Sequence, residues 1–244
     1  MYGMYGYGYG YGLDPTIILV LIGVALSLWA QGRVNSTFSR YSRVRSMTGM
    51  TGAEAARRLL NAQGIYDVTV QQIAGELTDH YDPRTKTVNL SQSVYGATSV
   101  AAIGVAAHEC GHAMQDNEGY APLRFRSALV PVANFGSSLS WPLILLGLVF
   151  GGLGSPLVEI GILMFSLAVL FQLVTLPVEY NASARAVRLL DAQGILAGEE
   201  VNGTRKVLNA AALTYVAALL MSVLQLLRYV LIFVGRNNRG RRDN

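Results

Sequence analysis

The sequence predicts a mainly α-helical integral-membrane protein with about four transmembrane helices and one small α+β domain. Two observations carry this prediction. The chain of 244 residues is 52% hydrophobic and only 14% charged, whereas an ordinary soluble domain carries about 25% charged residues. The apolar residues also gather in long blocks, separated by one polar stretch at residues 32–127. This composition excludes a disordered chain, a coiled coil and a typical cytosolic enzyme.

The positive charge follows the apolar blocks. The net charge is +4, and only Lys86 and Lys206 are lysines, so arginine supplies the other positive side chains. A nucleic-acid surface would gather basic and aromatic residues on a polar face, whereas membrane proteins place arginines beside their spans. We therefore expect a lipid bilayer and no nucleic acid as partner. The single cysteine, Cys110, excludes an intramolecular disulfide framework.

The first elements are a leader and a membrane span. Residues 1–12 alternate Tyr and Gly and have no core-forming period. Residues 13–31 are predicted to form the first transmembrane helix, with Pro15 in its first turn. A cleaved signal peptide is the rival interpretation, but the positive segment that should precede it is missing. Arginines follow this span instead, so we expect the N-terminus outside and the next segment in the cytoplasm.

The polar stretch 32–127 is predicted to be an α+β domain. Thr51 and Glu54 have the spacing of a capping box, which predicts a helix that ends at Gly64. Residues 66–75 alternate weakly, as a strand would.

The second half of this domain combines a hairpin with a helix. Asp82 to Thr85 form a turn signal between two short strands, of which the second is residues 86–90. Residues 99–115 then space their apolar side chains for a helix.

The remaining chain alternates between apolar and polar helical blocks. Residues 128–177 are predicted to form a transmembrane helical hairpin, and 178–209 a polar segment whose helix ends at Gly194. Residues 210–235 form a fourth span or a membrane-embedded helix, and 236–244 form a basic tail. Four crossings would put the tail outside, although its arginines favour the cytoplasm, so its side stays open.

One motif has the spacing of a metal site. His108, Glu109 and His112 form H-E-x-x-H on the predicted helix 99–115. Residues four apart share one face of a helix, so both imidazoles can reach one ion of Zn²⁺ size. Glu109 can then take a proton from a water bound to the metal. Cys110 projects to another side of the helix, and we expect it to pack as a small buried hydrophobe. The alternative is that His108 and His112 are structural residues of an amphipathic helix and bind no metal.

A catalytic zinc site needs a third protein ligand, and two candidates stay open. His80 is the third histidine of the chain. Glu179 follows the hairpin 128–177, whose two crossings return the chain to the side that carries H-E-x-x-H. We favour Glu179 over His80. Glu159 is excluded because it falls near the opposite end of its span.

Longer blocks resemble a known family, the YugP-type membrane zinc metallopeptidases of bacteria. The resemblance runs from Asp14 to about Gln193 and rests on the blocks AQGRVNSTFSRYS, TGAEAARRLL, LTDHYDPRTKTVNLSQSVY, VAAHECGHAMQ, GYAPLRFRSALVPVAN and LPVEYNASARAVRLL. The family is similar to the wider gluzincin group that includes the HtpX and CAAX-prenyl proteases. It implies a zincin-like α+β metallopeptidase domain at 32–127 with one Zn²⁺ per chain. Where the wider group has an Asp, this chain has Ser183.

Carried over by position, the resemblance implies His108, His112 and Glu179 as zinc ligands and Glu109 as general base. It also suggests that the hairpin around His80 and its neighbour Tyr81 forms the upper rim of a cleft, where a peptide adds as a strand. Either side chain could then donate to the oxyanion. The alternative for the same segment is a stable turn capped by Asp82.

We therefore expect a membrane-embedded zinc endopeptidase, a multi-pass protein of the plasma membrane with its active site at the cytoplasmic face. Its substrates would be peptides or membrane proteins. Two alternatives stay open: a membrane scaffold or regulator that retains a structural zinc, and a zinc hydrolase of a non-peptide bond. Glu109 discriminates against the scaffold, because a structural site has no need of a non-ligand acid. The sequence predicts neither the oligomeric state nor accessory partners.

Overall fold

The structure is a computed structural model that describes residues 14–152 and 155–240. The side chains of residues 151 and 234–240 are not among those described. The predicted leader at 1–12 and the end of the basic tail at 241–244 lie outside the described residues.

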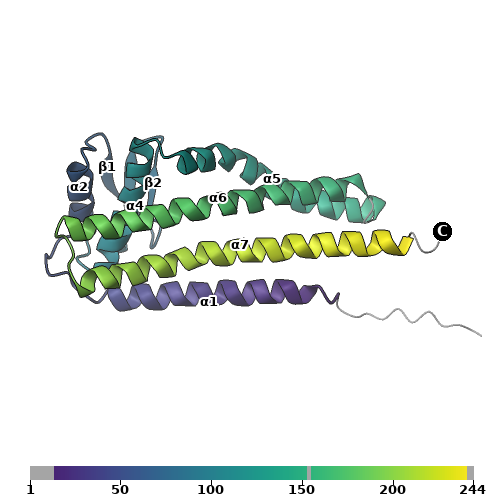
Figure 1. Ribbon diagram of the computed structural model, residues 1–244, viewed down its shortest axis with the longest axis horizontal. Coiled ribbons are helices and arrows are strands. Elements are labelled where there is room, and N and C mark those ends of the chain that lie inside the picture. Colours follow the sequence, from purple (N-terminus) through teal and green to yellow (C-terminus); the bar gives the residue numbers. More distant parts are fainter. Residues whose placement is uncertain (1–13, 153–154, 241–244) are drawn as a thin grey trace, which may run out of the picture.

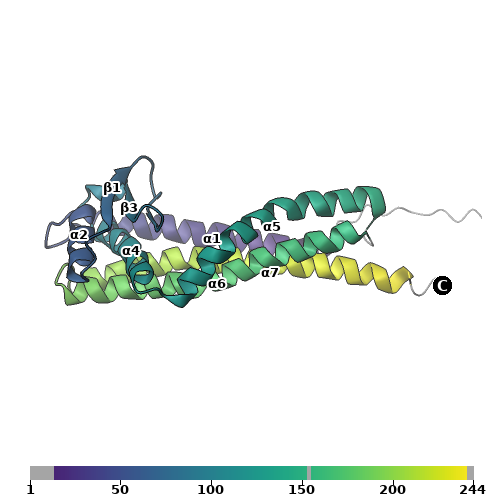
Figure 2. The ribbon, with the colours of Figure 1, turned by 90° about the horizontal axis from the view of Figure 1, so that it is seen from above.

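Long helices form an elongated bundle with a compact head at one end (Figure 1). These helices are α1 (Ile17–Tyr41), α5 (Ala121–Gly151), α6 (Pro156–Ala192) and α7 (Glu199–Gly240). Helix α7 lies between α1 and α6, and α5 packs on α6 (Figures 1 and 2). Within the described residues, four helices are long and apolar enough to cross a membrane. Many of their large apolar side chains are exposed, among them Trp29, Trp141 and Leu163. The prediction of a mainly helical protein is confirmed, and the four apolar blocks lie in the four candidate membrane-spanning helices.

The head is the α+β part of the molecule. Its elements are α2 (Gly52–Ala62), β1 (Thr69–Ile73), β2 (His80–Asp82), β3 (Thr87–Ser91), α3 (Gln92–Tyr95) and α4 (Val100–Asn117). The sheet has the order β1-β3-β2, with β1 parallel and β2 antiparallel to β3. The central strand β3 is buried along its length. Strand β2 lies at one edge of the sheet and is short.

Local signals set the helix starts in the head. The Thr51 hydroxyl accepts a hydrogen bond from the Glu54 amide at 3.2 Å, and the Glu54 carboxylate accepts one from the Thr51 amide at 2.8 Å. This reciprocal pair satisfies two amides that the first turn of α2 leaves free. The Ser99 hydroxyl accepts a bond from the Ala102 amide and starts α4 in the same way. The predicted capping box and both helix starts are confirmed.

Helix α4 joins the head to the bundle through close approaches at two of its glycines. A side chain at Gly111 would place its Cβ 2.6 Å from the Ala182 carbonyl oxygen of α6. At Gly104 it would lie 2.8 Å from the Thr204 side chain of α7. Only glycine permits such an approach. The close contact presses the face of α4 that carries His108 and His112 against α6.

The helix boundaries differ from those expected from the sequence in several places. Helices α5 and α7 begin earlier than expected, at Ala121 rather than residue 128 and at Glu199 rather than residue 210. Helix α1 continues through the polar residues after its apolar run and ends at Tyr41 rather than near residue 31. Helix α6 runs unbroken through Pro177, where a new helix was expected to begin, and it ends at Ala192, in agreement with the stop predicted at Gly194. Proline removes only one hydrogen bond, here to the Leu173 carbonyl, and packing against α4, α5 and α7 keeps the helix continuous.

Candidate metal centre

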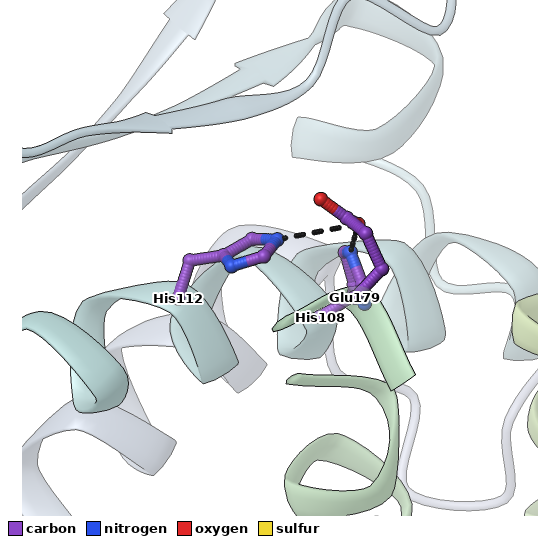
Figure 3. A group of neighbouring side chains, drawn as sticks. All are labelled: His108, His112 and Glu179. Atoms are coloured by element: carbon purple, nitrogen blue, oxygen red, sulfur yellow. Dashed lines mark hydrogen bonds and ion pairs between the residues drawn. The ribbon is translucent and has the colours of Figure 1, made fainter. Parts of the chain in front are cut away.

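Two helices bring together three potential metal ligands. His108 and His112 lie one turn apart on α4, and their ring centroids are 4.8 Å apart in an edge-on arrangement. Glu179 of α6 points at both rings (Figure 3). The possible ligand atoms of the three residues all lie within 4.8 Å of one another. No local sequence feature joins Glu179 to the histidines; the α5–α6 hairpin does so.

The distances fit a tetrahedral ion. Glu179 Oε2 lies 3.2 Å from His108 Nε2 and 3.5 Å from His112 Nε2. Ligands held about 2.0–2.1 Å from a tetrahedral zinc are separated by about 3.3 Å. Two imidazole nitrogens and one carboxylate oxygen are also a usual donor set for catalytic zinc. The residues present therefore fit a zinc ion, with a fourth position left for water or substrate.

Buried polar groups hold both rings by the nitrogen that faces away from Glu179. His112 Nδ1 lies 3.0 Å from Gln115 Oε1, and the amide nitrogen of Gln115 donates to the Val178 carbonyl at 2.9 Å. The Ser183 hydroxyl lies 3.1 Å from His108 Nδ1. Such partners set the tautomer and the ring orientation that a metal requires. Ser183 thus reaches the ring from the position where the wider group has an acid.

Charge around the rings favours a cation. Burial alone would lower the pKa of His112, but the hydrogen bond to Glu179 and the charges of Glu109 and Glu179 outweigh it and raise the pKa. A group of acids that draws a proton onto a buried imidazole also favours a metal ion at the same place.

Two cavities meet at these side chains. One of about 320 Å³ opens toward the sheet hairpin and the start of α5, and one of about 180 Å³ lies toward α1 and α7. Both are lined by His108, Glu109, Glu179, Asp79 and Tyr215. Glu109 is 7% exposed. The three ligand candidates and Glu109 therefore face a space that a substrate can enter.

Comparison with known proteins shows the family to which the chain belongs. Residues 16–234 match the model of a family described as "Putative neutral zinc metallopeptidase". The chain belongs to this neutral zinc metallopeptidase family. It is also similar to a Bacillus subtilis (strain 168) protein named "Putative membrane protease YugP", with 49% identity over 228 residues, which cover 93% of this chain and 99% of that protein. No solved structure gives a significant match.

The hairpin that carries β2 borders the larger cavity. His80 and Tyr81 of the edge strand β2 line it. Asp82 also caps the turn, accepting bonds from the Arg84 amide at 2.9 Å and the Thr85 hydroxyl at 3.0 Å. The two interpretations of this hairpin are therefore compatible.

The structure does not bring His80 into the group of possible ligands. Its Nδ1 lies 2.9 Å from the Thr78 carbonyl oxygen and its Nε2 lies 3.2 Å from the Asn89 amide nitrogen. The Tyr81 hydroxyl donates to Asp116 at 2.8 Å. Both rim side chains are thus held in place by neighbours in the head.

Arg126 of α5 is a residue that sequence reasoning missed. Its Nη1 lies 3.5 Å from Glu179 Oε1, the oxygen that the histidines do not contact. Its Nε is buried and has no hydrogen-bond partner among the described residues. The guanidinium thus holds one carboxylate oxygen and leaves Oε2 for the rings. The only sequence signal was an arginine at the entrance of an apolar block of the metallopeptidase.

Two other side chains of the metallopeptidase stay outside the site. Cys110 is fully buried in the head, its Sγ is 3.6 Å from the Ala56 carbonyl oxygen, and burial raises its thiol pKa. The structure thus agrees with its interpretation as a small buried hydrophobe. Arg185 forms an ion pair with Glu118 at 2.6 Å and lines neither cavity at the metal centre.

Proposed function

We propose that this protein is a membrane-embedded zinc-dependent endopeptidase that hydrolyses peptide bonds in peptide or membrane-protein substrates. One Zn²⁺ per chain would be held by His108, His112 and Glu179. The observation that carries this proposal is the convergence of the three donors within 4.8 Å, with Glu179 3.2 Å and 3.5 Å from the two imidazoles and Glu109 beside them in the same cavity. Membership of a zinc metallopeptidase family agrees with it.

Glu109 is the proposed general base. When bound, zinc would polarise the scissile carbonyl and lower the pKa of a water molecule. Glu109 follows the first histidine, faces both cavities and has no ion-pair partner within 4.0 Å among the described residues. Its carboxylate is therefore free to accept the proton of the attacking water and to pass it to the leaving amine.

The rim and Arg126 are proposed to bind the substrate. The outer edge of β2 has no neighbouring strand in the sheet, so an extended peptide can pair with it across the larger cavity. Arg126 and His80 both line that cavity and both could donate to the oxyanion. We favour Arg126, because both ring nitrogens of His80 already have partners.

The orientation in the membrane follows from the arginines. Arg33 and Arg40 lie toward the head end of α1 and Arg43 directly follows the helix, and the positive-inside bias places such residues in the cytoplasm. We therefore propose a plasma-membrane protein whose head and metal centre lie at the cytoplasmic face. Labelling of a cysteine introduced in the head, in intact and in opened cells, tests this side.

The experiment on function compares the wild type with Glu109→Gln in the purified full chain, using fluorescein-labelled casein as substrate. Loss of a general base costs about 10²- to 10⁴-fold in rate, so we expect at least a hundredfold lower cleavage at unchanged zinc content. Glu76→Gln is the matched control, because Glu76 is exposed in the head and lines neither cavity. Equal cleavage by Glu109→Gln and wild type would contradict the assignment.

A further inference from the structure

A second basic cavity lies away from the metal centre. It has a volume of about 640 Å³ and lies between α1 and α7, with Tyr180 of α6 at its side. Three cations line it: Arg33 and Arg40 from α1, and Lys206 from α7. The other lining residues are polar or apolar, and none of them is a carboxylate. The cavity therefore favours an anion.

This basic cavity and the metal centre use opposite faces of α7. Lys206 and Leu213, seven residues apart, lie on one stripe of the helix and line the basic cavity. Leu208 and Tyr215 follow Lys206 and Leu213, respectively, by two residues. They line the cavity at the metal centre. At about 100° per residue these stripes are roughly 160° apart. A ligand in one cavity thus leaves the other unobstructed.

The three cations have no acid to neutralise them. None of them forms an ion pair within 4.0 Å among the described residues. Other cations of the chain do pair, for example Lys86 with Asp67 at 2.8 Å. The positive charge of the cavity is therefore left for a ligand.

The cavity lies beside the ends of two apolar runs, where lipid headgroups are expected. The apolar run of α1 ends at Ala30, and that of α7 begins at Ala210. Arg33 follows the first run by one turn, and Lys206 precedes the second by one turn. Ala210 and Leu213 line the membrane end of the cavity. Its basic part thus faces the boundary and its apolar part continues into the span.

One end of the cavity is fixed by a close helix contact. A side chain at Gly203 of α7 would place its Cβ 2.7 Å from the ring of Tyr41, so α1 and α7 approach closely there. The Arg40 guanidinium lies 5.6 Å from the centre of the same ring. The spacing of the two helices at this end is thus set by packing, and it does not depend on a ligand.

We propose that this cavity binds the phosphate headgroup of an anionic phospholipid. Arg33, Arg40 and Lys206 contact the phosphate, and the acyl chains leave along Ala210 and Leu213 into the bilayer. Basic pockets between membrane helices are suited to such headgroups. The apolar part of the cavity distinguishes a lipid from free phosphate, because free phosphate has no apolar group to place there. This site is independent of the proposed peptidase activity and goes beyond it.

The test measures binding of fluorescent phosphatidylglycerol to the purified full chain in neutral detergent. Unlabelled phosphatidylglycerol should displace the probe, while phosphatidylcholine and inorganic phosphate at the same concentration should not. Each of Arg33→Gln, Arg40→Gln and Lys206→Gln should weaken binding about fivefold, and the triple variant roughly a hundredfold. Displacement by inorganic phosphate as strong as by the lipid would overturn the proposal in favour of a soluble-phosphate site.

A matched triple variant controls for net charge. Arg43→Gln, Arg124→Gln and Arg188→Gln remove the same charge from exposed positions outside this cavity. Binding by this control should stay within about twofold of wild type. Equal loss in both triple variants would overturn the proposal, because the attraction would then come from overall charge. Unchanged zinc content and thermal unfolding of both variants show that each is folded.

Discussion

The head and the membrane bundle use the same apolar residue types in opposite ways. Helix α6 passes through both regions and shows the difference within one element. Leu190, at the head end, is fully buried, whereas Leu163, in the span, is 60% exposed. In the head, burial from water drives packing. In the span, lipid is as apolar as leucine, so exposure costs nothing and helices associate through close packing and polar contacts.

The metal centre lies where the two regions meet. The head supplies His108 and His112 on a buried helix, and the bundle supplies Glu179 and Arg126. The site can therefore form only when both regions are folded and docked. Four predictions test this difference between the regions, from the largest expected effect to the smallest.

Loss of a ligand from the head should disable the site completely. His112→Ala should reduce bound zinc to less than a tenth of wild type and lower peptidase rate by at least about a thousandfold, because two donors cannot hold a catalytic ion. Elemental analysis and the casein assay measure both quantities. His80→Ala, at the rim, is the control and should keep its zinc. Metal loss in the His80 variant would show that His80 is a ligand after all.

A buried and an exposed leucine of α6 should differ sharply. Leu190→Ala should lower the free energy of unfolding by about 2–5 kcal/mol, because it leaves a cavity in the head. Leu163→Ala should cost less than about 1 kcal/mol, because that side chain faces lipid in the folded protein. Denaturant unfolding in detergent measures both. Equal losses in the free energy of unfolding would contradict the proposed difference between the head and the span.

Glycine at the docking contact should matter more than glycine on the surface. Gly111→Ala should destabilise by about 1–3 kcal/mol and weaken zinc binding, since its new methyl group meets the backbone of α6 at Ala182. Gly32→Ala places a methyl group in open space on α1 and should be neutral or stabilise by up to about 1 kcal/mol. Thermal unfolding and zinc titration compare the two. If Gly111→Ala left both stability and zinc binding unchanged, the close contact of α4 with α6 would not be needed for either.

The groups that hold the imidazoles should have the smallest effects. Gln115→Ala and Ser183→Ala should weaken zinc binding by about 10- to 100-fold without removing a ligand. We expect the larger loss for Gln115, which is fully buried and also bonds to α6, whereas Ser183 bonds to His108 alone. Competition with a zinc-binding dye measures the affinities. A larger loss for Ser183 would reverse the order in which we rank the two contacts.

Local chemistry explains which parts of the molecule the sequence predicts. The capping box of Thr51 and Glu54 and the spacing of His108 and His112 depend on neighbours within a few residues. The approach of Glu179 also followed from the sequence, because two crossings return a chain to the same side of a membrane. Arg126 did not, since no local pattern shows which side chain an arginine at a membrane boundary will meet. The continuity of α6 through Pro177 was missed because tertiary packing overrode a local helix-breaking signal.

Pro177 has a mechanical consequence for the site. It leaves the Leu173 carbonyl without its helical donor, so α6 is softest against bending just before Glu179. The histidines lie on a different helix, α4, in the head. A change in bilayer thickness that alters the tilt of α6 would therefore move the carboxylate relative to the imidazoles. The thickness of the surrounding bilayer thus becomes a physical variable that acts on the geometry of the metal centre.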